Sequence, residues 1–200
     1  MARGHTEVLI PMVRRVLAAA AAGFSDVNLV GVTIGPGAFT GLRVGLAAAH
    51  GIALAANVPC VGVTTLEALA AAVQGRKPDE RIVLTVLDTR RGDFYAQAFS
   101  AEGTALGMPQ VVDAAMLPSL VAAPEAWVAG DARAAAVAVL RTAGIAAEPV
   151  AGSDHADAAT IAAIAAHRFH GGSIDPQLPL PLYIRRPEAT MAADGGQRRP

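Results

Sequence analysis

The chain is poor in cysteine, aromatic residues and charge. Its 200 residues include one cysteine, one tryptophan and two tyrosines, and only 16% are charged. The lone Cys60 excludes an internal disulfide, and its apolar surroundings predict a small core residue in a reducing compartment. The formal net charge of −1 argues against the broad basic surface that autonomous nucleic-acid binding requires.

Long apolar stretches are also missing. No run reaches the roughly 20 residues of a membrane-spanning helix, and the N-terminus lacks the order of charge, apolar core and cleavage site found in signal peptides. We therefore expect a cytoplasmic protein without a membrane segment. With 53% hydrophobic residues, the chain can bury a core and form one or two domains.

The chain does contain a glycine-rich segment, residues 35–45, with the sequence GPGAFTGLRVG. It follows an apolar run over residues 27–34, which predicts a buried strand. It precedes an alanine-rich run over residues 42–56, which predicts a helix. Amides at the start of that helix could receive an anion or a partner. Close packing of helix on strand explains the glycines equally well.

Spacing excludes three common loop motifs. The third glycine comes one position too late for a Rossmann fingerprint, and Asn57 stands near the place of its acidic residue. No lysine ends the loop as a Walker motif requires, and Pro36 removes an amide donor. The G-x-S-x-G of a nucleophile elbow is absent.

The five histidines do not form a metal site. They are spread over helix entries, faces and ends: His5, His50, His155, His167 and His170. The segment around His155, residues 153–157, predicts a helix cap, and the last two histidines suit the negative end of a helix dipole. We expect no bound metal and no cofactor.

Periodicity and turn residues predict an alternation of helices and strands, typical of a largely parallel sheet covered on both faces. We expect helices over residues 6–22, from 64 to about 73, and over 114–121, 132–143 and 157–169. A short strand after Pro59 is expected to end at residue 63. Further strands are expected over residues 82–88, 94–100, 108–113 and 126–130, and near 149. Gly23 is a candidate C-cap, and Thr64 with Glu67 forms a capping-box pattern.

Four blocks in order along the chain, residues 3–11, 35–70, 88–95 and 181–185, resemble the TsaB (YeaZ) family. This family is the accessory subunit of bacterial tRNA threonylcarbamoyladenosine synthesis. The resemblance implies an α/β fold of the actin-like, ribonuclease H-like type, with two lobes that each open with a three-stranded meander. Residue 1 lies almost at the first helix, so we expect an N-terminally truncated chain whose first lobe lacks its opening β-meander.

The expected domains are a first lobe over residues 1–77, a second lobe over 78–186 and a disordered tail over 187–200. The polar segment 74–80 marks the boundary between the lobes.

The catalytic paralogue of the family carries a His-Leu-Glu-x-His segment whose histidines hold a metal. Aligned on Leu66 and Glu67, this chain has Thr65 and Leu69 in place of the histidines. A hydroxyl is a poor replacement for imidazole, and leucine has no lone pair to give. The resemblance therefore implies a non-catalytic subunit that binds and supports the threonylcarbamoyltransferase acting on adenosine 37 of tRNA.

Other readings stay open: a metallopeptidase-like (glycoprotease) enzyme, an actin-like phosphotransferase, or a homodimeric scaffold. The resemblance implies a heterodimer with the catalytic paralogue, and the ATPase subunit of the same pathway is a further candidate partner. Contact with tRNA is expected only through the complex. ATP binding is not expected without the aspartate-bearing opening strand of the first lobe.

In the family, the two first-lobe helices pair with the same helices of the catalytic subunit. Carried over, the contact surface comes from residues 6–22 and 42–56. Gly45 and Ala49 are four residues apart, so another helix could approach closely, although packing on the chain's own sheet is an equal alternative. The predicted partner-contact residues are Glu7, Leu9, Val13, Arg14, Gly35, Pro36, Gly37, Phe39, Thr40, Gly41, Arg43, Gly45 and Ala49. No catalytic residue is expected.

Overall fold

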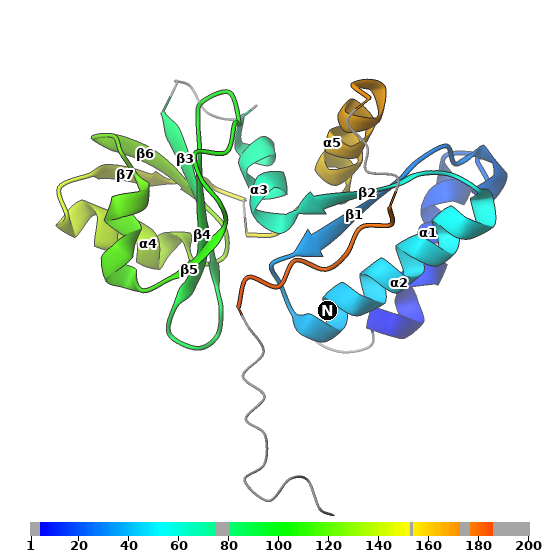
Figure 1. Ribbon diagram of the computed structural model, residues 1–200, viewed down its shortest axis with the longest axis horizontal. Helices are drawn as coiled ribbons and strands as arrows, with labels where there is room; N and C mark the ends of the chain where they lie inside the picture. The colour runs from blue at the N-terminus through cyan, green and yellow to red at the C-terminus, as the bar shows by residue number, and fades with distance from the viewer. Residues whose placement is uncertain (1–4, 75–80, 153, 173–176, 186–200) are drawn as a thin grey trace, which may run out of the picture.

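The computed structural model describes residues 5–74, 81–152, 154–172 and 177–185. They form two lobes that lie side by side, with α3 between them and a C-terminal segment that runs across both (Figure 1). In the described residues, one sheet has two strands and the other has five. The predicted tail, residues 187–200, lies outside the described residues.

The first lobe is built on two parallel strands, β1 (Val30–Gly35) and β2 (Cys60–Thr64), joined by α2 (Phe39–Ala56). The apolar run over 27–34 forms a strand only from Val30, because a single 3-10 turn, η1 (Phe24–Asp26), comes before it. Where α2 packs on the strands, a small apolar core forms from Val32, Leu46, Ala49, Ala53 and Cys60. The prediction that Cys60 is a core residue is confirmed.

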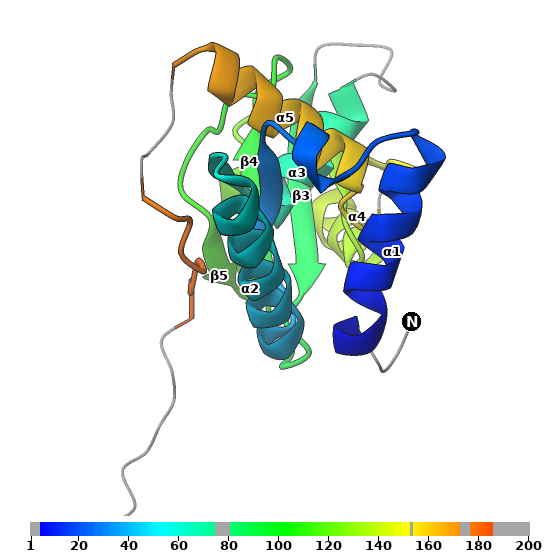
Figure 2. The ribbon, with the colours of Figure 1, turned by 90° about the vertical axis from the view of Figure 1, so that its right-hand side faces the viewer.

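Helix α1 (His5–Ala19) lies beside α2 (Figure 2), and Pro11 does not stop it. The helix ends before the predicted residue 22, and the prediction that Gly23 caps it is wrong. Ala21 takes the left-handed conformation instead (φ 52°), and the Ala22 N–H donates to the Leu17 carbonyl at 2.9 Å, as in helix ends closed by glycine. Gly23 precedes η1.

The second lobe holds a mixed sheet with the order β5-β4-β3-β6-β7. Its strands are β3 (Ile82–Asp88), β4 (Phe94–Phe99), β5 (Gln110–Val112), β6 (Glu125–Ala129) and β7 (Ala146–Pro149). The first three form the predicted antiparallel meander, and β6 and β7 add to β3 in parallel. The expectation of a largely parallel sheet is therefore met by only half of this lobe.

Two helical segments cover the second lobe's sheet. The 3-10 helix η2 (Ala114–Leu120), which contains Pro118, takes the place of a predicted helix, and α4 (Arg133–Thr142) follows β6. Fully buried members of the core below them include Leu84, Val86, Leu117, Val128 and Leu140.

By its residue numbers, α3 (Thr65–Gln74) belongs to the predicted first lobe and α5 (Ala158–His170) to the second, yet each packs against the other lobe. Helix α3 buries Leu66, Ala70 and Val73 against Val83 and Phe99 of the second lobe. Helix α5 returns to the first lobe and packs on β1 and β2. The lobes are therefore joined by shared packing as well as by the chain.

Both helices begin with a cap that the sequence predicted. The Glu67 N–H donates to Thr64 Oγ1 at 3.0 Å, and the Thr160 N–H donates to Asp157 Oδ2 at 3.3 Å. The Glu67 carboxylate pairs with Arg168 of α5, so the acidic half of the Thr64 capping box ties two helices together.

Candidate functional site

The glycine-rich loop turns the chain sharply from β1 into α2. Gly35 has a φ of 115°, and a Cβ there would lie 3.1 Å from the Leu182 carbonyl oxygen and 3.3 Å from Leu42 Cδ2. Both the backbone conformation and the space therefore favour glycine. The Gly35-Pro36 peptide bond is cis. Helix α2 begins at Phe39 rather than at residue 42, and no side chain caps it.

An aromatic and cationic cluster lies on the first turns of α2. The Arg43 guanidinium carbon lies 3.9 Å from the centre of the Phe39 ring, within the range of a cation–π contact. Arg43 Nε donates to the Tyr183 hydroxyl at 3.0 Å. The Tyr183 and Phe39 ring centres are 5.9 Å apart. The start of α2 is thus in contact with a segment 140 residues later in the chain.

The structure divides the predicted partner-contact residues into exposed and buried groups. Those exposed are Glu7, Arg14, Gly37, Phe39, Thr40, Gly41 and Arg43, and those half-buried are Leu9, Val13 and Gly45. Gly35, Pro36 and Ala49 are buried. Ala49 packs in the first lobe's own core, and the other two lie inside the turn, so the surface that these three predicted contact residues could offer a partner is small.

The helix pair α1–α2 exposes an unusual amount of apolar surface. No residue of α1 from 7 to 19 is buried; Val16 is 64% exposed on α1, and Leu54 is 81% exposed on α2. A Cβ at Gly45 would meet nothing within 4 Å, and one at Gly41 would meet only Ala38 Cβ at 4.0 Å. Packing within the chain explains Ala49 but leaves Gly41 and Gly45 unexplained.

Helix α2 is, among the described residues, long and apolar enough to cross a membrane by length and composition, with a mean hydropathy of 1.3. The sequence was not expected to contain a segment of this kind. The same helix packs its inner face on β1 and carries Arg43 in its second turn, so the feature suits a helix that presents an apolar face at a protein surface.

A cavity of about 750 Å³ lies between the lobes, within the size range of small-molecule pockets. It is lined by the start of α2, by Thr65, by β3, β4 and the turn between them, by Asp131, by residues 154–156 and by the C-terminal segment. The sequence did not predict this cleft, because its walls come from six separate parts of the chain.

The turn between β3 and β4 is held by carboxylates. Asp88 Oδ1 accepts from the Arg90 N–H at 2.7 Å, and the Asp88 N–H donates to Asp131 Oδ1 at 2.8 Å. Arg90 lies between these two carboxylates, 3.1 Å from Asp88 and 3.4 Å from Asp131. At the other end of the turn, Asp93 accepts from the Thr89 hydroxyl and pairs with Arg185. The Thr89 hydrogen bond, followed by Arg185, holds the pKa of Asp93 below its ordinary value.

The two positions aligned with metal-binding histidines have separate surroundings. Thr65 lines the cleft, whereas the Leu69 side chain is fully buried. Among the part of the chain that the structure describes, no three His, Cys, Asp or Glu side chains come together as metal ligands would.

The geometry defines a two-lobed α/β protein of the actin-like, ribonuclease H-like class, with a cleft between the lobes and an apolar helix pair on the outside of the first. A family model described as TsaD: tRNA N6-adenosine threonylcarbamoyltransferase matches residues 1–128. The chain belongs to this family, as a member of its TsaB (YeaZ) branch.

Similar proteins agree with this assignment. The tRNA threonylcarbamoyladenosine biosynthesis protein TsaB of Escherichia coli K12 is 34% identical over 121 residues, which is 60% of this chain and 51% of that protein. The chain thus spans about half the length of this curated relative, and the match to TsaB of Haemophilus influenzae spans 39%. An uncharacterized protein of Mycobacterium tuberculosis H37Rv is 35% identical over 94% of this chain and 78% of its own length.

Solved structures from Pseudomonas aeruginosa share the fold. An uncharacterized protein with similarity to peptidase YEAZ superposes with a TM-score of 0.75 at 26% identity, covering 92% of this chain and 86% of its own. A second structure, YeaZ, gives a TM-score of 0.71 at 26% identity over 89% of this chain and 84% of its own.

Proposed function

We propose that this protein is a non-catalytic partner subunit in tRNA threonylcarbamoyladenosine synthesis, and that it binds the catalytic threonylcarbamoyltransferase through α1 and α2. The names of the E. coli and H. influenzae relatives support the pathway. The exposed apolar surface of the helix pair, with open space over Gly41 and Gly45, is the observation that carries the mode of binding.

The energetic argument concerns the two glycines. Each glycine inside a helix costs about 1 kcal/mol relative to alanine. No contact of Gly45 within the chain offsets this cost, since the space above it is open. A helix of another protein could lie close against α2 at such a position, and apolar surface of the two helices would leave water on binding.

The non-catalytic assignment rests on Thr65 and Leu69. Leu69 lies in the core and offers no ligand atom.

In this proposal the protein works in the cytoplasm as a heterodimer, with the ATPase subunit of the pathway as a further candidate partner, and it meets tRNA only within the complex. Zinc or iron bound one-to-one, with turnover by this protein alone, would contradict the assignment. An actin-like phosphotransferase would instead be stabilised against heat by ATP.

The helix-pair interface is tested by placing a leucine over α2. Gly45→Leu fills the open space on the proposed contact face, and we expect it to weaken binding to the threonylcarbamoyltransferase at least about fivefold, because overpacking costs about 1–3 kcal/mol. Binding is measured by calorimetry with both purified proteins. Gly51→Leu is the comparison variant, because Gly51 is on the same helix, a Cβ there also meets nothing within 4 Å, and it points about 120° away at 100° per residue.

Gly45→Ala gives a second test, because it should change the stability of the isolated protein and the stability of the complex in opposite directions. Alanine should raise the free energy of unfolding of the isolated protein by about 0.5–1 kcal/mol, while it should weaken the complex. No binding between the wild-type proteins at micromolar concentrations would sink the proposal, and so would equal effects of leucine at positions 45 and 51.

A further inference from the structure

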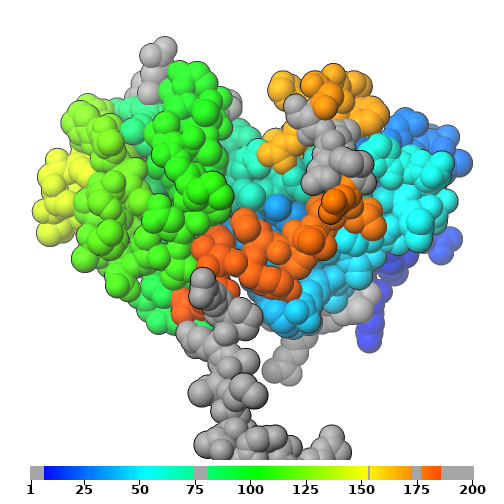
Figure 3. Space-filling model, in the orientation of Figure 1, coloured from blue at the N-terminus to red at the C-terminus, as the bar shows by residue number. Residues whose placement is uncertain are grey.

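The C-terminal segment, residues 177–185, follows a path that neither lobe requires for its own core. After α5 it runs extended along the first lobe beside α2 and reaches the second lobe at its end (Figure 1). The space-filling view shows it lying over the junction between the lobes (Figure 3). Four of its residues, 182–185, also line the cleft. We call residues 177–185 the strap.

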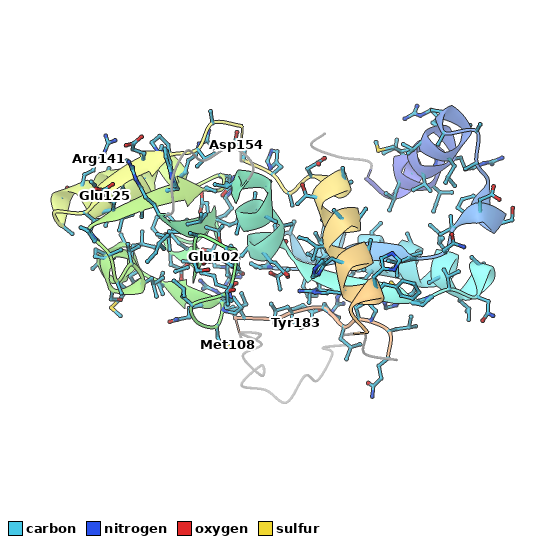
Figure 4. All side chains as sticks on the ribbon, turned by 90° about the horizontal axis from the view of Figure 1, so that it is seen from above. Glu102, Met108, Glu125, Arg141, Asp154 and Tyr183 are labelled. Carbon is cyan, nitrogen blue, oxygen red and sulfur yellow. The ribbon has the colours of Figure 1, made fainter. Side chains whose placement is uncertain are left out.

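The strap is attached to the first lobe at three successive points. The Pro179 carbonyl accepts from His50 Nε2 of α2 at 3.0 Å. The Leu182 N–H donates to the Ile34 carbonyl of β1 at 2.8 Å. The Tyr183 hydroxyl then accepts from Arg43. Figure 4 shows Tyr183 on the part of the strap that passes between the lobes.

Glycines in the first lobe make room for the strap. A Cβ at Gly62 would lie 2.6 Å from Ile34 Cγ2 of β1 and 2.8 Å from Pro179 Cβ, and one at Gly35 would lie 3.1 Å from the Leu182 carbonyl oxygen. The contacts at Gly62, being under 3.0 Å, could not be made without movement of β1 or the strap. The seat of the strap is therefore shaped by β1 and β2 and is not an incidental resting place.

Two residues after Tyr183, the strap changes lobe. Arg185 Nη2 pairs with Asp93 Oδ2 in the β3–β4 turn, and both side chains are largely shielded, at 24% and 19% exposed. The Thr89 hydroxyl donates to the same carboxylate. A partly desolvated, charge-assisted hydrogen bond is stronger than an exposed ion pair, so this contact is a firm attachment to the second lobe.

We propose that the strap is a clasp that fixes the opening of the interlobe cleft, with the Arg185–Asp93 pair as its fastening point. Helix α3 joins the lobes on one side, and the strap joins them at a separate place (Figure 1). With both attachments the lobes hold one spacing; with the pair broken, α3 becomes a hinge and the cleft widens. The clasp is independent of the proposed partner function.

The test measures the distance between the lobes in the full-length chain. Spin labels are placed on cysteines introduced at Ala47 of α2 and Ala135 of α4, both exposed, in a Cys60→Ala background. Arg185→Gln should shift the mean distance upward by more than the width of the wild-type distribution. Amide exchange at Leu182, whose N–H donates to the Ile34 carbonyl, should rise about tenfold or more, the factor for losing one charge-assisted hydrogen bond.

Arg81→Gln is the matched control, because Arg81 pairs with Glu125 and Glu148, all within the second lobe. It should leave the interlobe distance unchanged. Asp93→Asn, which keeps the shape of the side chain, should reproduce the shift and serves in place of Arg185→Gln if that variant does not fold. An unchanged distance in the folded Arg185 or Asp93 variant would overturn the proposal, as would an equal shift in Arg81→Gln.

Discussion

The two lobes differ in how completely they bury their own cores. In the second lobe, a five-stranded sheet lies under α4, η2 and α3, and Leu84, Val86 and Leu140 are fully buried. In the first lobe, α2 covers two strands, and the members of the small core between them keep some exposure, from 2% at Ala53 to 8% at Val32, although Val63 of β2 is fully buried. Both lobes expose large apolar side chains, but those of the first lobe include Val16 and Leu54 on the neighbouring α-helices α1 and α2, whereas Leu106, Met108 and Met116 of the second lobe lie outside its α-helices. We infer that the second lobe supplies stability and that the first is shaped for contact.

The largest expected difference between the two lobes is in how the free energy of unfolding responds when a glycine is replaced by alanine. Gly130 follows β6 with a φ of 109°, and a Cβ there would lie 2.0 Å from the Val86 carbonyl oxygen. The backbone of β3 must move to admit it, so Gly130→Ala should lower the free energy of unfolding by more than about 3 kcal/mol. Urea titration measures this. The same substitution at Gly45 should stabilise, and a loss of equal size at both sites would contradict the comparison.

A difference of intermediate size between the two lobes is expected in the rate at which buried thiols react. Burial raises the pKa of the Cys60 thiol, so reaction with a disulfide reagent at pH 7 requires the first lobe to open. A cysteine at Ala98, in a Cys60→Ala background, reports on the second lobe from a similar burial of 7% against 5%. We expect Cys60 to react about tenfold faster or more. Equal rates in the folded proteins would mean that the lobes open together.

Local sequence signals predicted the second lobe better than the first. The strand over residues 82–88 is recovered with both ends, because its apolar run stops at a polar turn. Outside the second lobe's sheet, the caps of α3 and α5 were also predicted, at Thr64 and within residues 153–157, since capping depends on neighbours within one turn. In the first lobe, Ala21 closes α1 where a glycine was expected. The residue at which α1 ends depends on how the chain enters η1, and no local sequence pattern shows this.

The candidate site was only partly predictable. Exposed residues such as Phe39 and Arg43 were named from the resemblance, whereas the burial of Ala49 depends on which face of α2 meets β1. The strap was recognised as a motif at residues 181–185, yet no role could be assigned to it. Its contacts join residues 92 positions apart, as between Asp93 and Arg185, and spacing along the chain carries no signal for such pairs.

The smallest effect is the pH dependence of the clasp. Hydrogen bonding from Thr89, and then Arg185, lowers the pKa of Asp93 from 3.8, so the folded protein binds that proton less readily than the unfolded chain. A depressed carboxyl pKa adds stability that is present above about pH 4 and is lost as the pH falls through the folded value. The melting temperatures of wild type and Asp93→Asn should therefore differ by a constant amount between about pH 5 and 7 and should begin to converge below about pH 4. A difference that persists unchanged at about pH 3 would show that it does not come from the charge of Asp93, and the ion pair with Arg185 would then not be its cause.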